Sequence, residues 1–201
     1  MIRSQAKNIK VPIALTYVKK LFDFDISDIT DLCDQQKNNP SFDEKMKKGF
    51  EKFQNSLDKY FDLLDISSAE GSQIKIFSSV TLKNSAILRA TNKFHNQPCF
   101  SNITVIINNE ELFEYQSDSG LCYAQTLLIT EITLPDKSSL HLALVQWYNY
   151  KSRARPNLLG CPLLKLSEWY NFIEIEAIED IVHVIPRFNK INEYFVNKYL
   201  F

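Results

Sequence analysis

The spacing of apolar residues changes once along this chain, and that change constrains its fold more than any other feature. Between residues 12 and 64 apolar residues recur every three or four positions, which is typical of amphipathic helices. After the linker SSAEGSQ (67–73) they occur in short runs or alternate with polar residues, as in strands. We therefore predict an α+β fold, with a helical segment over residues 1–68 packed on an antiparallel β-barrel over residues 72–201.

The first part of the helical segment reads PIALTYVKKLFDF, followed by ISDITDLCDQQ. We predict one helix or two short ones over residues 12–36, with Asp25 capping the second part. The residues expected on the apolar face of the first part are Ile13, Tyr17, Val18, Leu21 and Phe22.

A stronger helix signal follows over residues 40–65. Ser41 and Glu44 have the spacing of a capping box, and an apolar stripe extends from Met46 to Leu64 opposite a charged face. Such a stripe must be buried. We expect it to pack on the rest of the chain, and the alternative is that it pairs between two copies in a self-assembling protein.

The second part of the chain is rich in Ile, Val, Thr, Tyr and Phe, with polar turns between the runs. The turn LPDKSS (134–139) predicts a long hairpin. Closure into a barrel would remove the exposed edges of so many strands. The predicted strands cover residues 74–80, 85–91, 102–108, 111–116, 122–134, 140–150, 171–178 and 181–188, with a last apolar run at 193–201.

Charge and cysteine content exclude several classes of protein. The 23 Lys and Arg are balanced by 24 Asp and Glu, whereas nucleic-acid binding normally leaves a basic excess. The four cysteines lack the close spacing of a zinc site or redox pair, so we expect free thiols in an intracellular protein. No secretory signal and no apolar run of about 18 residues is present, so no membrane partner is expected.

Catalytic motifs are also missing from the sequence. The histidines, His95, His141 and His183, share no metal-ligand spacing with one another or with a carboxylate. Only four glycines are present, and none forms a phosphate-binding loop. We expect no enzymatic activity, no catalytic residues, no cofactor and no metal.

One aromatic cluster stands out, in LALVQWYNYK (142–151). With two aromatic residues from the next segment it could form a cage for a cationic peptide side chain. The alternative is ordinary packing, because alternation along a strand places Trp147 and the two tyrosines on opposite faces. The candidate peptide-binding residues are Trp147, Tyr148, Tyr150, Trp169 and Tyr170.

The order of elements from residue 121 onward resembles the bromo-adjacent homology (BAH) domain, in which a strand ending in an aromatic trio precedes a loop, an IPV-type segment and a closing aromatic strand. The chain departs from that pattern at Asn149, Tyr150 and Lys151, where BAH domains continue with Arg-Pro-Glu. The phrases NKFHNQPCFSNITV, GCPLLKL and HVIPRFNKINEYFVNKYLF also resemble the C-terminal module of multiplied fungal proteins linked to mobile elements. The positions that match the BAH pattern are Val145, Trp147, Tyr148, Ile173, Ile175, Ile178, Ile181, Val182, His183, Val184, Tyr194 and Phe195.

The resemblance implies a non-catalytic protein-interaction module, associated with chromatin, that binds a protein or a histone-like peptide. A nuclear location would follow from that role. The alternative is an accessory nucleic-acid-binding protein of mobile-element origin. Its contacts with phosphate, or with an acidic partner, would come from Lys151, Arg153 and Arg155 in the loop after the aromatic cluster.

Overall fold

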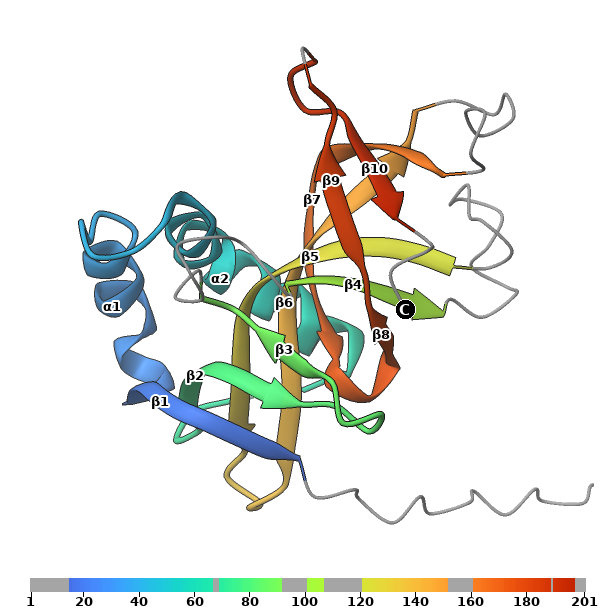
Figure 1. Cartoon of the computed structure of the whole chain (residues 1–201). Helices are drawn as coiled ribbons and strands as arrows, with labels where there is room; N and C mark the ends of the chain where they lie inside the picture. The colour runs from blue at the N-terminus through green and yellow to red at the C-terminus, as the bar shows by residue number, and fades with distance from the viewer. Residues whose placement is uncertain are drawn as a thin grey trace, which may run out of the picture.

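The computed structural model describes residues 15–66, 69–91, 101–106, 121–151, 161–188 and 190–197. They form a mixed fold, mostly antiparallel sheet, with helices on one side (Figure 1). The helices are α1 (Ile29–Gln36) and α2 (Glu44–Leu63), with the 3-10 turns η1 (Ile26–Asp28) and η2 (Ile175–Ala177). The strands are β1 (Thr16–Asp25), β2 (Gln73–Thr81), β3 (Ile87–Arg89), β4 (Asn102–Ile106), β5 (Leu121–Thr133), β6 (Ser139–Tyr150), β7 (Leu163–Glu174), β8 (Ile178–Ile181), β9 (His183–Pro186) and β10 (Tyr194–Asn197).

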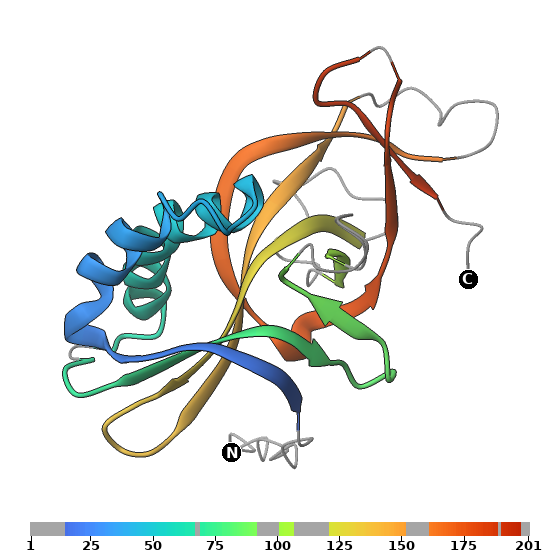
Figure 2. The same cartoon turned by 60° about the vertical axis from the view of Figure 1, so that its left-hand side comes forward.

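The strands belong to one sheet whose main path runs β1-β2-β5-β6-β7-β10-β9. Strand β3 pairs with β2, and β4 pairs with both β5 and β8. The sheet curls into a partly closed barrel, with α1 and α2 against its outer side (Figure 2). The barrel-like antiparallel architecture and the β5–β6 hairpin are therefore as predicted. The strand predicted at residues 111–116 lies outside the described residues.

The prediction of helix over residues 12–36 is wrong for Thr16–Asp25, which is strand β1. It pairs with β2 and extends the same sheet, with a bulge between Lys20 and Phe22. The bulge inserts an extra residue into the alternation, so the apolar residues of β1 acquire a spacing that imitates a helix. Asp25 does cap the turn that follows, since its carboxylate accepts a hydrogen bond from the Ser27 N–H at 3.0 Å.

Helix α2 is observed where the apolar stripe predicts it, but its cap differs. The carboxylate of Asp43, rather than a Ser41–Glu44 box, accepts a hydrogen bond from the Met46 N–H at 2.8 Å. The stripe is buried on the outer face of the sheet within this chain, which is the intrachain packing we expected. The buried residues of the stripe are Met46, Phe50, Phe53, Leu57 and Phe61.

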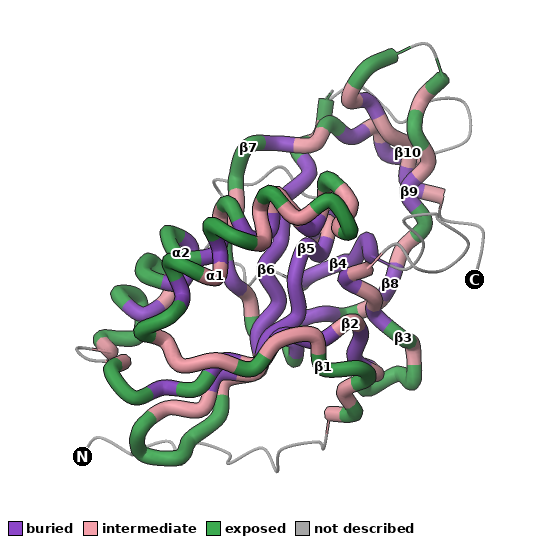
Figure 3. The backbone as a smooth tube through the Cα atoms, turned by 90° about the vertical axis from the view of Figure 1, so that its left-hand side faces the viewer, coloured by how far each residue is buried: buried purple, intermediate pink, exposed green. Residues whose placement is uncertain are grey.

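Burial is concentrated on both faces of the curled sheet (Figure 3). Inside the curl, Phe77, Val145 and Trp147 belong to one hydrophobic core. On the outer face, Phe53 meets Phe172 edge-on, with ring centroids 5.3 Å apart, in a second core shared with the helices. In the described part of the chain, no helix is long and apolar enough to cross a membrane.

Lys45, in the first turn of α2, departs from this pattern. Its stem is partly exposed, but its ammonium nitrogen is buried and has no hydrogen-bond partner among the residues that the structure describes. Burial lowers the pKa of Lys45 to about 8, and the nearby carboxylate of Asp43 only partly opposes this effect. A buried amine without a partner destabilises the folded state.

We predict that Lys45→Met raises the free energy of unfolding at pH 7 by about 1–3 kcal/mol, because it removes that unpaired group and keeps the stem. The folded-state pKa is depressed, so the unfolded chain binds more protons above pH 8. The wild type therefore gains stability relative to the variant as the pH rises from about 8 towards 10.5.

Denaturant unfolding at pH 7, 8.5 and 10 measures both effects. Lys47→Met is the matched control, because Lys47 pairs with Glu44 at the surface, 2.8 Å away. A difference between Lys45→Met and wild type that does not change with pH would contradict the assignment.

Candidate functional site

Strand β7 carries a bulge where it faces the aromatic part of β6. Gln146 of β6 pairs with Tyr170, but Tyr148, two residues further on, pairs with Leu166. Residues 167–169 lie opposite Trp147 alone, so β7 has two residues more than the ladder matches, and we call residues 167–169 the β7 bulge. A bulge of this kind turns side chains away from the direction that alternation would give them.

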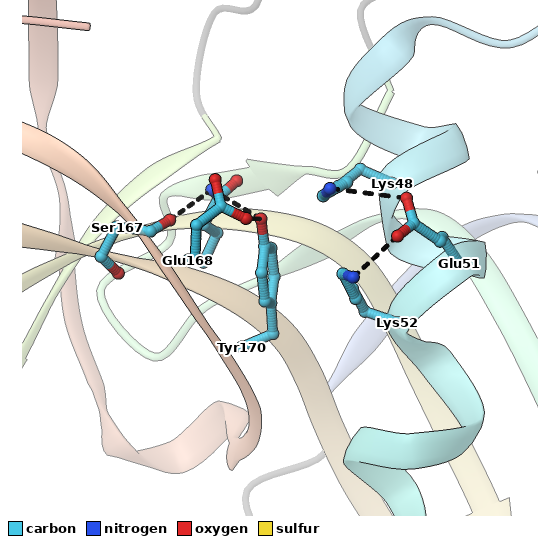
Figure 4. Close-up of polar contacts among 7 residues, drawn as sticks. Lys48, Glu51, Lys52, Ser167, Glu168 and Tyr170 are labelled. Carbon is cyan, nitrogen blue, oxygen red and sulfur yellow. Dashed lines mark hydrogen bonds and ion pairs between the residues drawn. The ribbon is translucent and has the colours of Figure 1, made fainter.

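A set of hydrogen bonds around Gln146 holds the β7 bulge, and the residues of β7 that take part, Ser167, Glu168 and Tyr170, are labelled in Figure 4. The Gln146 amide is buried and donates to the Ser167 carbonyl at 2.6 Å and to the Tyr170 hydroxyl at 2.9 Å. The Tyr170 hydroxyl donates in turn to the Glu168 carboxylate at 2.9 Å, and the Trp169 N–H donates to Ser167 Oγ at 3.1 Å. The bulge is thus a defined conformation, because its polar groups are satisfied locally.

A pocket of about 530 Å³ lies between the β7 bulge and α2. This volume falls within the range of sites that hold a small ligand or a few side chains. We call it the α2–β7 pocket. Its lining residues are Lys52, Asn55, Ser56 and Lys59 from α2, Trp147 from β6, and Glu168, Trp169, Tyr170 and Asn171 from β7.

Three of the five candidate aromatic residues line this pocket. Trp147 is only 7% exposed, and its indole N–H donates to Asn171 Oδ1 at 2.5 Å. Tyr170 is partly buried beside α2, whereas Trp169 is 60% exposed at the bulge. Sequence alone did not indicate the pocket, because its two main walls lie about a hundred residues apart in the chain.

The other two candidates, Tyr148 and Tyr150, do not line the pocket. They lie on the opposite face of β6 from Trp147, in a separate cluster, as strand alternation predicts. The Tyr148 hydroxyl donates to Asn102 Oδ1 at 3.0 Å, and its ring meets Tyr194 edge-on with centroids 5.5 Å apart. The five aromatic residues therefore do not converge on one cage.

Lysines of α2 lie over the ring of Tyr170. The Nζ atoms of Lys48 and Lys52 are 5.7 and 5.5 Å from its centroid, on the side that faces the helix (Figure 4). Both lysines also pair with Glu51, at 3.4 and 2.7 Å, which lowers the pKa of that carboxyl. Burial, followed by the hydrogen bond to Glu168, raises the pKa of Tyr170. One face of this ring is already in contact with cations from the same chain.

The loop predicted to bind phosphate is described only at its start. The Lys151 ammonium forms an ion pair with Glu193, which also accepts a hydrogen bond from Arg187 at 2.8 Å. The two cations, Lys151 first, lower the pKa of Glu193. Arg153 and Arg155 lie outside the described residues, so nucleic-acid binding by this loop stays a prediction.

Two of the three histidines are described, and they lie on different strands. His141 Nδ1 lies 2.6 Å from the Tyr17 hydroxyl, His183 is exposed on β9, and His95 lies outside the described residues. Within the described ranges, no three His, Cys, Asp or Glu side chains are grouped closely enough to hold a metal ion.

Cys33 and Cys122 are free thiols, as predicted. Burial raises the pKa of Cys33 to about 12 and that of Cys122 to about 11. Both thiols are therefore poor nucleophiles. Cys161 is half-buried, and Cys99 lies outside the described residues.

We predict that Gln146→Leu loosens the β7 bulge, because the Ser167 carbonyl and the Tyr170 hydroxyl lose their donor. The free energy of unfolding should fall by about 1–3 kcal/mol. Acrylamide quenching of Trp169, obtained by difference from a Trp169→Phe reference, should increase.

Thr130→Val is the control, because it removes another buried hydrogen bond, from Thr130 Oγ1 to the Leu142 carbonyl, away from the bulge. It should lower stability without changing the quenching. Equal quenching in Gln146→Leu and wild type would show that Gln146 does not hold the bulge.

Comparison of the chain with family models, with curated proteins and with solved structures found no match. The BAH resemblance thus stays a prediction that depends on the matched residues alone. Two of these residues, Val145 and Trp147, lie in the core inside the curl, so their apolar character has a structural explanation of its own.

Proposed function

We propose that this protein is a non-catalytic interaction module that docks a segment of a partner protein in the α2–β7 pocket. The observation that carries the proposal is the position of Trp169, which is 60% exposed on the β7 bulge beside the pocket. Tryptophan is the residue type most enriched among those that dominate binding energy at protein interfaces. A bound segment would cover the exposed indole and remove its apolar surface from water.

The shape of the site suits this role because it is held in place before a partner arrives. The buried Gln146 amide supports the β7 bulge, and α2 packs on the sheet through its apolar stripe. Neither wall needs a new hydrogen-bond network to present its side chains. Such preorganisation lowers the entropy cost of binding.

The chemistry of the lining supports binding rather than catalysis. The described lining residues include neither histidine nor cysteine, and the Glu168 carboxylate already accepts a hydrogen bond from the Tyr170 hydroxyl. The pKa of Tyr170 is raised, which makes this phenol a poor acid near neutral pH. Lysines, amides and indoles remain, and these are groups that recognise peptides.

The BAH resemblance implies the same general class, a domain that docks onto proteins. The proposal includes a chromatin-associated partner and a nuclear location, and both depend on this resemblance. The α2–β7 pocket is not suited to a methylated lysine, because Lys48 and Lys52 already lie over the Tyr170 ring. The proposed partner segment is therefore not a methylated histone tail.

The test is selection of a phage-displayed library of random 12-residue peptides on the folded protein. The enriched peptides are then synthesised, and their binding to the protein is measured by calorimetry. Changing Trp169 to Ala should weaken their binding about 30-fold or more, a loss of ~2 kcal/mol.

Phe188→Ala is the matched control, since Phe188 is an aromatic residue 86% exposed in the turn between β9 and β10. It should leave binding unchanged. The proposal fails if no peptide is enriched, or if Phe188→Ala and Trp169→Ala weaken binding equally.

A further inference from the structure

The charges around the α2–β7 pocket bear on the chemistry of its partner. Both glutamates near the pocket are already engaged by the chain itself. Glu51 pairs with Lys48 and Lys52, and Glu168 accepts the hydroxyl of Tyr170. Little negative charge is left for a cationic ligand.

Positive charge remains on the α2 wall. Lys59 is exposed and lines the pocket, and it forms no ion pair with any residue that the structure describes. Two lysines, Lys52 and Lys59, line the pocket against one glutamate, Glu168. The acidic residues next to Lys59 along the helix, Asp58 and Asp62, are exposed and do not belong to the lining.

The opposite wall offers a neutral donor. The indole N–H of Trp147 can only donate, so its contact at 2.5 Å assigns the acceptor oxygen of the Asn171 side chain. The NH₂ group of Asn171 is then the part of that amide left for a ligand. The α2 wall thus presents an ammonium group, and the β7 wall presents an N–H donor.

We infer that the docked segment is acidic, and that it places an anionic side chain between Lys59 and Asn171 beside an apolar residue on Trp169. This inference rests on the proposed docking function. Ammonium and amide N–H groups both donate to carboxylate or phosphate oxygens, and charge-assisted hydrogen bonds are the stronger ones. The anion can come from Asp or Glu or from a phosphorylated Ser.

A cationic segment is disfavoured at the same place. Like charges close together near a protein surface repel one another. A lysine or arginine entering the pocket would meet Lys52 and Lys59, and Lys48 lies close to the first of these across Glu51. The walls therefore select by charge as well as by apolar contact.

The experiment uses peptides enriched by the wild-type protein that depend on Trp169. Their acidic residues should exceed those of the unselected library. Each acidic residue of the best peptide is then replaced by Gln, and at one position this change should weaken binding in calorimetry at least 10-fold. Lys at that position should weaken binding further. Phosphoserine at that position should restore binding.

Lys59→Glu should weaken the acidic peptide at least 10-fold and reduce the salt dependence of its affinity. Lys83→Glu is the matched control, because Lys83 is also exposed and forms no ion pair with described residues, but it lies in the turn between β2 and β3, away from α2 (Figure 2). It should leave the affinity unchanged.

The outcomes separate the two proposals. If no peptide depends on Trp169, the docking function itself is wrong. If peptides depend on Trp169 but carry no acidic excess, or if Lys59→Glu and Lys83→Glu have equal effects, docking stands and the acidic partner is overturned. If Asp or Glu at that position supports binding and phosphoserine does not, the anion of the partner is a carboxylate.

Discussion

The arrangement of the pocket depends on how closely α2 approaches β5. A Cβ atom added at Gly49 would lie 2.8 Å from Leu128 Cγ, closer than packed carbons allow, and 3.2 Å from Leu127 Cβ. Glycine at this point lets the helix lie against the sheet, although glycine lowers helix propensity. The same close seating brings Lys48 and Lys52, within one turn of Gly49, over the ring of Tyr170.

The second requirement is a buried amide at the β7 bulge. A bulge leaves ladder groups unpaired, and unpaired buried groups are costly. Gln146 meets that requirement with two donated hydrogen bonds, so an interior polar residue of β6 maintains an irregular stretch of β7. This irregular stretch turns Trp169 towards solvent. The proposed binding site therefore lies where the regular alternation of side chains along β7 is interrupted.

Local patterns predicted the elements whose own residues determine them. The stripe of α2 and the hairpin of β5 and β6 were found, since amphipathic period and turn chemistry act over neighbouring residues. Strand β1 was missed because its bulge, between Lys20 and Phe22, shifts the apolar residues into helix-like spacing. The pocket could not be predicted, because it requires α2 to contact β7, which is distant in the sequence. The one local signal was the pair of consecutive polar residues Ser167 and Glu168, which interrupts the alternation of apolar and polar residues.

The aromatic residues illustrate why residue type alone does not determine what a site binds. Tyrosine and tryptophan rings attract cations, which made a cage for a cationic side chain a reasonable hypothesis from the sequence. The fold brings lysines of α2 to Tyr170 from a distant part of the chain, so the attraction is used internally. Lys52 and Lys59 of the same helix give the α2 wall its positive charge, and the rings that suggested a cation reader become the apolar part of the site.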